Sequence, residues 1–229
     1  MSTEARRRAY LEALEIDVWK RRGEDVAGDL DGAGETALAE PVAADWDGLK
    51  REVTACTLCA LHKSRTQTVF GVGNQAADWM IIGEAPGVEE DRRGEPFVGR
   101  AGKLLDEMLR AVGLQRDAVF IANILKCRPP NNRDPLADES SSCRAYLERQ
   151  IELVSPQLIL AVGRVAAQHL LGSDAPVGRL RGQKHTLNDG QLPVVVTYHP
   201  AYLLRSPTQK RKVWQDLCMA RQIMQQTNQ

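Results

Sequence analysis

Four short apolar runs recur along the chain. Each is rich in β-branched residues and nearly free of polar ones, and together they span residues 77–83, 118–125, 156–163 and 192–199. Runs of this kind are typical of strands that are buried on both faces of a parallel sheet. We therefore expect four such strands at the centre of the fold.

Amphipathic runs with helical spacing lie between and after these strands, at residues 102–112, 135–154, 165–171 and 207–226. Strands that alternate with helices predict a three-layer α/β/α domain with a central, mainly parallel, four-stranded sheet. Leading into the last strand, residues 179–193 predict a small β-hairpin, because Asn188, Asp189 and Gly190 are residue types that favour a tight turn.

The pattern changes before residue 46. Apolar positions at helical spacing in residues 4–22 predict an N-terminal helix within residues 1–22, and residues 23–45 are acidic, rich in Gly and Ala, and typical of a flexible linker. The folded domain is therefore expected at residues 46–229. The N-terminal helix is a candidate binding site for a protein partner, with docking on its own domain as the alternative. The chain is otherwise expected to be a monomer.

Composition and charge narrow the class of protein. The chain is 43% hydrophobic and 26% charged, no apolar run reaches the length of a membrane span, and the first residues lack the apolar core of a signal peptide. We expect a cytoplasmic protein that does not contact a membrane. The formal net charge is zero, but residues 1–45 hold 6 basic and 11 acidic residues, so the remaining chain is mildly basic. A basic domain suits a polyanionic partner without identifying one.

Three polar or Gly-rich segments follow predicted strands. The segment "GEAPGVEEDRRGEPFVGRAG" begins at Gly83, Asn123 lies near the end of the second strand, and "HPAYLLR" begins at His199. Ligands of open parallel sheets bind outside the carboxyl ends of the strands, which is where these segments should meet. Gly and Pro in the first segment also let a ligand approach the main chain closely. The sequence thus predicts a ligand pocket at this edge of the sheet.

Four of the five cysteines are candidate metal ligands. Cys56 and Cys59 form a CxxC motif, and Cys127 and Cys143 are separated by fifteen residues. Their polar flanks argue against a role as small buried hydrophobes, whereas Cys218 lies in an apolar helical run that suits such a role. Four thiolates suit either zinc or an iron–sulfur cluster, and the spacing does not choose between them.

Taken together, these motifs resemble the iron–sulfur uracil-DNA glycosylases of family 4, a branch of the uracil-DNA glycosylase superfamily. The resemblance covers about residues 50–225 and rests on the CxxC motif, "GEAPGVEEDRRGEPFVGRAGKLLDEML", "IANILKCRPPNNRDP" and "YHPAYLLR", in the family's order. It implies a uracil-DNA glycosylase-like fold and a 4Fe-4S cluster held by Cys56, Cys59, Cys127 and Cys143. It does not extend to residues 1–45.

The resemblance also implies an activity. The protein would be a monofunctional uracil-DNA glycosylase, a DNA-repair hydrolase that flips uracil out of DNA and leaves an abasic site in base excision repair. A non-catalytic iron–sulfur nucleic-acid-binding protein or damage sensor is one alternative, and a glycosylase for a broader set of deaminated bases is another. The preference for single- or double-stranded DNA, the strictness of thymine exclusion and any redox role of the cluster stay open.

By resemblance, five residues would bind the flipped base. Phe97 would stack on the uracil ring, and the Asn123 amide would pair with its imide N–H and adjacent carbonyl. Ala85 and Pro86 would line the pocket with little side-chain bulk. Glu90 would close off the 5-position of the base and so exclude thymine.

Two residues would act on the glycosidic bond. His199 would donate a hydrogen bond to the 2-carbonyl of uracil, as either a neutral or a charged imidazole. Glu84 would orient or activate the attacking water. Related glycosylases carry an Asp for this role one position later, where Ala85 stands, and Glu90 and Asp91 are further carboxylates in the same segment. Which carboxylate activates water therefore stays open.

The remaining candidates would contact DNA. By resemblance, Leu203, Leu204 and Arg205 would insert into the duplex and fill the gap left by the flipped base. Arg128 and Arg133 are candidates for phosphate contacts. The helix that opens at "VGRAGKLL" offers free N–H groups to a further phosphate.

Overall fold

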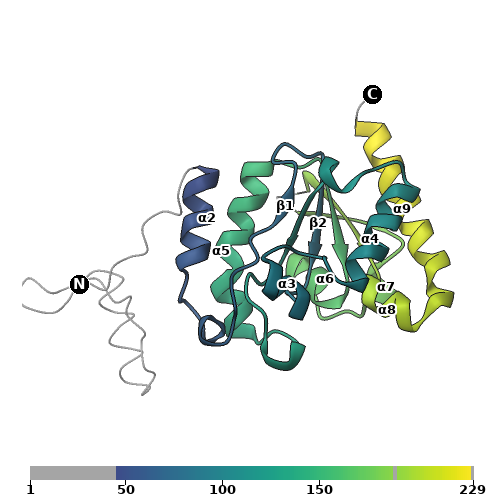
Figure 1. The fold of residues 1–229 in the computed structure, drawn as a ribbon. Helices are drawn as coiled ribbons and strands as arrows, with labels where there is room; N and C mark the ends of the chain where they lie inside the picture. Colours follow the sequence, from purple (N-terminus) through teal and green to yellow (C-terminus); the bar gives the residue numbers. More distant parts are fainter. Residues whose placement is uncertain (1–44, 188–189, 228–229) are drawn as a thin grey trace, which may run out of the picture. The chain divides into compact units, whose positions relative to one another are not determined.

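A mixed sheet forms the centre of the computed structural model, which describes residues 45–187 and 190–227 (Figure 1). Within that part of the chain the sheet has six strands in the order β1-β3-β2-β4-β6-β5. Strands β3, β2, β4 and β6 run parallel, and β1 and β5 pair antiparallel at the two edges. The strands are β1 (Val72–Gly73), β2 (Trp79–Gly83), β3 (Phe120–Asn123), β4 (Leu158–Val162), β5 (Lys184–Leu187) and β6 (Leu192–Thr197).

The three-layer fold and the four predicted parallel strands are confirmed, but the prediction of a four-stranded sheet is wrong. The predicted hairpin is present, and its first strand, β5, joins the same sheet through antiparallel pairing with β6. Strand β1 is only two residues long, too short to give a recognisable apolar pattern. Asn188 and Asp189 of the predicted turn lie outside the described residues, as do the predicted helix at residues 1–22 and, apart from Asp45, the predicted linker.

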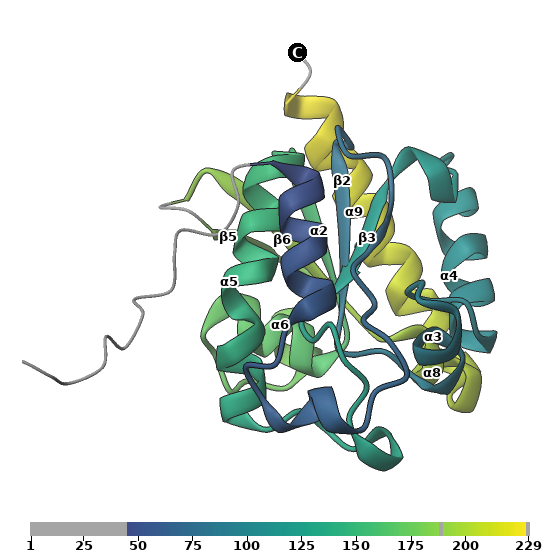
Figure 2. The same cartoon turned by 60° about the vertical axis from the view of Figure 1, so that its left-hand side comes forward.

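Helices cover both faces of the sheet, as Figures 1 and 2 show from two sides. One face is covered by α2 (Trp46–Ala55), α5 (Ala137–Val154), α6 (Arg164–Leu171) and α7 (Val177–Leu180). The other face is covered by α4 (Arg100–Ala111) and α9 (Lys210–Thr227). Short 3₁₀ turns lie at Ala60–Lys63, Arg116–Ala118, Pro130–Asn132 and Pro207–Gln209. None of the described helices is both long and apolar enough to cross a membrane.

The four predicted helices correspond to α4, α5, α6 and α9, with Pro207–Gln209 forming a separate turn before α9. Two further helices follow strands: α3 (Val88–Arg93) comes after β2, and α8 (Pro200–Arg205) comes after β6. Because the central strands are parallel, α3 and α8 begin at the same end of the sheet, where the ligand pocket was predicted.

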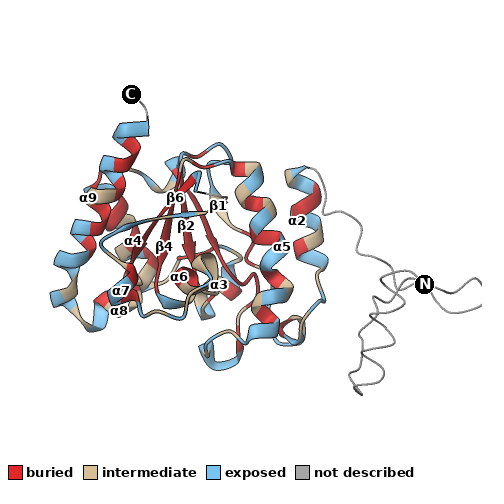
Figure 3. Ribbon diagram, turned by 180° about the vertical axis from the view of Figure 1, so that it is seen from behind, coloured by how far each residue is buried: buried red, intermediate tan, exposed pale blue. Residues whose placement is uncertain are grey.

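The four parallel strands are buried on both faces, as Figure 3 shows by the red of the central sheet and of the helix surfaces turned toward it. Ile81, Ile121 and Leu160 pack toward α4 and α9, whereas their neighbours Met80 and Ile82 pack toward α5 and α6. All five side chains have zero accessible surface. This two-sided burial explains why the strands are continuous apolar runs rather than alternating ones.

A buried polar network ties the end of β6 to α9. Asp216 is fully buried; it accepts hydrogen bonds from Arg181 Nε and Nη2 at 3.0 and 2.7 Å and from Thr197 Oγ1 at 2.8 Å. Replacing Asp216 with Ala should lower the free energy of unfolding by about 3–5 kcal/mol, because Arg181 would keep a largely buried charge without its partner. Urea denaturation measures this change.

The matched control is Glu107→Ala, which removes the carboxylate of the exposed Glu107–Arg110 ion pair on α4. An exposed pair contributes little to stability, so this variant should unfold close to the wild-type midpoint. Equal losses in the two variants would contradict a special contribution from the Asp216 network.

Candidate active site and cysteine site

A pocket of about 470 Å³ opens at the carboxyl ends of the parallel strands. Its walls come from the segments that follow β2, β3 and β6, as predicted, and from the start of α4. All seven residues expected to bind or cleave at uracil line it: Glu84, Ala85, Pro86, Glu90, Phe97, Asn123 and His199. Of the five candidate DNA contacts, Arg133 and Arg205 also line it.

Phe97 is held in an unusual backbone conformation inside the pocket. Its φ is 53°, in the left-handed region, and its side chain is buried with the ring stacked on that of His199 at a centroid distance of 5.5 Å. A Cβ at Gly102 would lie 1.7 Å from the Phe97 carbonyl oxygen, so the first turn of α4 packs directly against this main chain. A left-handed non-glycine residue costs about 1–3 kcal/mol and persists where its surroundings impose it, often at functional sites.

Asn123 ends β3 with an unpaired polar atom. The residue is 2% exposed, and its Oδ1 is buried without a hydrogen-bond partner among the described residues. Gly83, its neighbour on β2, makes room for it, because a Cβ there would lie 2.5 Å from Asn123 Oδ1 and 2.6 Å from Phe97 Cζ. A buried carbonyl oxygen left unpaired costs about 1–3 kcal/mol, which a ligand N–H group would recover.

His199 is a neutral hydrogen-bond donor in this pocket. Its Nδ1 accepts a hydrogen bond of 3.1 Å from the Ala201 N–H at the start of α8, which assigns the proton of a neutral ring to Nε2. Burial, reinforced by Arg205, lowers the pKa of His199 to about 4, although Glu90 opposes the shift. The ring is therefore uncharged near pH 7, which answers a question that the sequence left open.

Glu84 follows β2 and makes no side-chain hydrogen bond or ion pair with the described residues. Its carboxylate is half-buried, and burial raises its pKa, helped by the charge of Asp134 and opposed by that of Arg164. Arg164 and Asp134 form an ion pair with each other. A carboxylate without protein partners is available to a water molecule.

Glu90 and Asp91, the two other candidate carboxylates, already have protein partners. Glu90 Oε1 accepts the main-chain N–H groups of Val98 and Gly99, both at 3.0 Å, and so holds the segment that carries Phe97. Asp91 is buried and accepts the Thr66 N–H with both oxygens, at 2.9 and 3.1 Å. Their contacts make Glu84 the better candidate for binding water.

The four candidate ligand cysteines line one small cavity beside α2 and α5. Cys56 follows α2, Cys59 precedes the Ala60–Lys63 turn, Cys127 follows β3, and Cys143 lies in α5. All five cysteines are free thiols, and Cys218 on α9 does not line this cavity. The fold therefore brings together the four cysteines selected from the sequence and leaves out the fifth.

Residues 70–218 match the family model of the uracil-DNA glycosylase superfamily. The chain belongs to this superfamily. It is 46% identical over 167 residues to a Type-4 uracil-DNA glycosylase of Archaeoglobus fulgidus, over 70% of this chain and 84% of that protein. It is 41% identical over 179 residues to a Type-4 uracil-DNA glycosylase of Thermotoga maritima, over 77% of this chain and 93% of that protein. The resemblance inferred from the motifs is confirmed.

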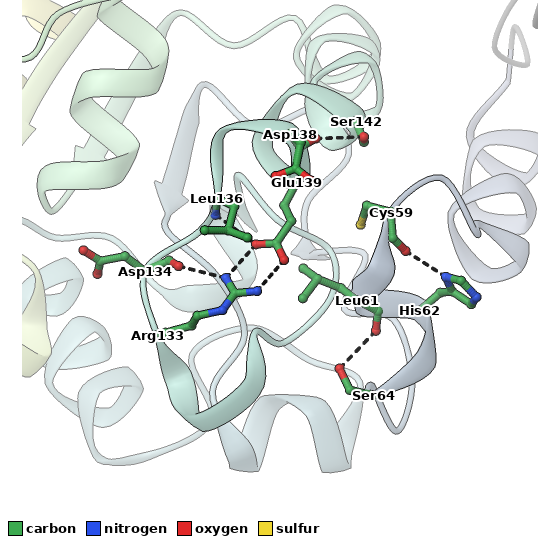
Figure 4. Close-up of polar contacts among 10 residues, drawn as sticks. All are labelled: Cys59, Leu61, His62, Ser64, Arg133, Asp134, Leu136, Asp138, Glu139 and Ser142. Atoms are coloured by element: carbon green, nitrogen blue, oxygen red, sulfur yellow. Dashed lines mark hydrogen bonds and ion pairs between the residues drawn. The ribbon is translucent and has the colours of Figure 1, made fainter.

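The donor chemistry of the cysteine site in this uracil-DNA glycosylase domain fits a cluster. Arg65 Nη1 donates to Cys127 Sγ at 3.0 Å. His62 Nδ1 donates to the Cys59 carbonyl at 2.7 Å, as Figure 4 shows. Burial raises the pKa of the Cys143 thiol to about 11, opposed by the main-chain N–H of Lys126. In the described part of the chain, no three Cys, His, Asp or Glu side chains are arranged around a single metal ion. A polynuclear cluster holds its thiolates farther apart than a single ion does. The absence of a single-ion site is therefore compatible with a cluster at the four cysteines.

One of the predicted DNA contacts is not at the surface. Leu203 is 1% exposed and packs in the core beneath α8, so this side chain would have to leave the core to enter the duplex as predicted. Leu204, the next residue, is 40% exposed, and Arg205 is exposed at the rim of the pocket. Successive residues of a helix point in different directions, and of the two leucines only Leu204 faces solvent.

The two arginines near Cys127 have protein partners. Arg133 donates to both carboxylate oxygens of the buried Glu139, at 2.5 and 2.8 Å, and Glu139 also accepts the Leu136 N–H at the start of α5 (Figure 4). Arg128 Nε donates to Asn132 Oδ1 at 2.7 Å. Both arginines thus order the segment between Cys127 and α5, and their phosphate contacts stay predictions.

Sequence reasoning missed Arg164, whose charge reaches Glu84. It is the first residue of α6 and is separated by Gly163 from β4, which lies between β2 and β6 in the sheet. The ends of β2, β3 and β6 were recognised by the polar segments that follow them. Only the pair Gly163–Arg164 follows β4, and such a pair is too common in sequences to mark a site. The strand order, which the sequence does not show, is what places Arg164 near the pocket.

Proposed function

We propose that the protein is a monofunctional uracil-DNA glycosylase that flips uracil out of DNA, hydrolyses its N-glycosidic bond and leaves an abasic site for base excision repair. The observation that supports this most directly is the buried, unpaired Oδ1 of Asn123 in a pocket that also holds Phe97 and the neutral His199. Membership of the superfamily and two relatives described as Type-4 uracil-DNA glycosylases support the same reaction.

Base recognition follows from the polarity of Asn123. Its Oδ1 accepts the N3–H of uracil, and its amide N–H donates to the 4-carbonyl. Cytosine presents an acceptor and a donor in the reverse order and would leave buried groups unpaired. Phe97 stacks on the ring, Ala85 and Pro86 leave space for its edge, and Glu90 lies toward the 5-position, where thymine carries a methyl group.

Bond cleavage uses the two groups that face the base and the sugar. As the bond from C1′ to N1 breaks, its electron pair moves into uracil, and the Nε2–H of His199 stabilises the charge that grows on the 2-carbonyl oxygen. The Glu84 carboxylate orients a water molecule whose oxygen adds to C1′ and whose proton passes to the carboxylate. Uracil leaves as an anion and takes up a proton from solvent, and Glu84 releases its proton to solvent. The products are uracil and an abasic sugar, and no lysine nucleophile is required.

The pH profile should report on Glu84. Only the carboxylate form can accept the water proton, and the pKa of Glu84 lies above its ordinary value of 4.5. The single-turnover rate of uracil excision should therefore fall as the pH drops through a midpoint above 4.5, while His199, with its pKa of about 4, is still neutral. Rates measured from pH 8 to 4.5 on wild type and Glu84→Gln test this.

Glu84→Gln should be slow and should lose this acid limb. The same limb at the same midpoint in Glu84→Gln would assign it to another group and would remove Glu84 from the reaction. Glu107→Gln, on the exposed side of α4, is the matched control and should keep the wild-type profile.

The four cysteines would hold a 4Fe-4S cluster. When bound, it would cross-link the end of α2, the Ala60–Lys63 turn and α5 through thiolate bonds, a structural contribution, since hydrolysis moves no electrons. Leu204 and Arg205 contact DNA beside the pocket, with Arg128 and Arg133 as further phosphate contacts. The protein acts as a cytoplasmic monomer on uracil-containing single- or double-stranded DNA, and residues 1–22 are a candidate site for a protein partner.

One experiment separates this function from its alternatives. The purified protein is assayed for iron, sulfide and visible absorbance, then incubated with single- and double-stranded oligonucleotides that carry one uracil, and free uracil is quantified. Iron-loaded protein that binds DNA but releases no base would favour the non-catalytic binding protein. Release of hypoxanthine at a rate similar to that of uracil would favour the broader-specificity glycosylase.

A further inference from the structure

Lys126 is a buried cation that the proposed reaction does not use. It is 1% exposed, lies between Leu125 and Cys127, and forms no ion pair with a carboxylate in the described part of the chain. Burying an ammonium group is costly unless its N–H groups find hydrogen-bond acceptors. The contacts of this side chain should therefore show why it is there.

The ammonium group of Lys126 joins α5 to the end of β3, the strand that carries Asn123. Lys126 Nζ donates to the main-chain carbonyl of Asn123 at 2.8 Å and to Gln150 Oε1 at 2.6 Å. Gln150 is itself fully buried on α5, and its Nε2 donates to the Phe70 carbonyl at 2.8 Å. The chain of contacts runs from Asn123 through Lys126 and Gln150 to Phe70, and each link is a buried hydrogen bond.

The main chain of Lys126 belongs to the cysteine site. Its N–H lies near enough to the Cys143 thiol to lower the pKa of that thiol, its carbonyl accepts the Val69 N–H at 2.8 Å, and the residue lines the cysteine cavity. The same residue therefore contacts a cysteine through its backbone and Asn123 through its side chain. Asn123 and Cys127 are separated by only three residues of the chain.

We propose that Lys126 is a positioning residue for uracil recognition, which holds the main chain of Asn123 against Gln150 and so fixes the Asn123 amide relative to Phe97 and His199. This inference rests on the proposed function. It assigns the bridge Lys126–Gln150 a role in base recognition rather than in DNA binding, because neither side chain lines the substrate pocket. The bridge also gives the cysteine site a physical connection to the base-reading residue.

The test compares Lys126→Met and Gln150→Leu with wild type. Met keeps the unbranched apolar stem of Lys126 and removes the ammonium group, and Leu removes the acceptor that Gln150 offers. Four quantities are measured: iron per chain, affinity for DNA with an abasic-site analogue, the inhibition constant of free uracil and the single-turnover excision rate. A small misplacement of a binding group commonly costs about 10- to 100-fold, so Lys126→Met should lose this much in excision rate and in uracil affinity.

The expected pattern is specific to positioning. Iron content and DNA affinity should stay close to wild type in both variants, and Gln150→Leu should show the same losses as Lys126→Met but smaller ones. Gln157→Leu is the matched control, since Gln157 precedes β4 at the opposite end of the sheet and hydrogen-bonds to Asp78. It should match wild type in all four measurements.

The opposite results are equally clear. Wild-type uracil inhibition and excision in Lys126→Met would overturn the proposal, and so would a loss of DNA affinity equal to the loss of uracil affinity, which would indicate general loosening. Where Lys126→Met yields no folded protein, Gln150→Leu decides, and normal uracil inhibition in that variant counts against the proposal. Wild-type protein that releases no uracil would instead refute the proposed function itself.

Discussion

Replacing Asn123 with Leu should lower kcat/KM for uracil excision by about 10³-fold, because the N3–H and 4-carbonyl of the flipped base would each be buried without a partner at about 2 kcal/mol apiece. The free energy of unfolding should not fall. In the free protein the variant removes an oxygen that is already unpaired, and Leu has the same branched arrangement of four side-chain heavy atoms. The excision assay and urea denaturation of the same sample measure both effects.

This combination of lost activity and retained stability is what separates a binding residue from a structural one. Asn74→Leu is the matched control, because Asn74 is exposed and precedes β2 at the opposite end of the sheet. That variant should excise uracil at the wild-type rate. If Asn123→Leu were strongly destabilised and otherwise active, Asn123 would be a structural residue and the recognition scheme would be wrong.

Replacing His199 with Ala should reduce the single-turnover rate by about 10²–10³-fold, the usual effect of removing one donor aimed at a developing oxyanion. Binding of DNA should change little, because the bond strengthens only as the base departs. His199→Gln restores an N–H donor and should recover part of the rate, as expected if a neutral group suffices. Rates at saturating enzyme, with DNA affinities measured separately, test this.

His169→Ala provides the control for loss of an imidazole. His169 is half-buried on α6, away from the pocket residues, and should be dispensable for excision. Equal rates in His199→Ala and wild type would remove His199 from the reaction and would leave the pocket as a binding site.

The sequence predicted the parts of the fold that depend on long, regular patterns. The parallel strands were visible because two-sided burial makes each of them continuously apolar, and α5 was visible because its length repeats the helical pattern many times. Strand β1 and helices α3 and α8 were missed because each has six residues or fewer, too few for a period to show. Tertiary contacts, rather than local preference, stabilise elements of that length.

The candidate site was predictable for a different reason. Polar residues directly after apolar strands, such as Glu84, Asn123 and His199, are conspicuous, and parallel strands bring their ends to one edge. The choice between Leu203 and Leu204 could not be made, because it depends on the face that α8 turns toward the core. The neutral state of His199 likewise depends on burial and on a contact with the Ala201 N–H that no sequence pattern reveals.

The positions of the four cysteines along the chain have a consequence for biosynthesis. All four precede β4, whereas the strand that leads into His199 comes near the end. A ribosome that synthesises the chain from its N-terminus therefore completes the thiol set before the last two parallel strands exist. The four cysteines are therefore present in the nascent protein at a stage when the pocket that holds His199 has not yet been made.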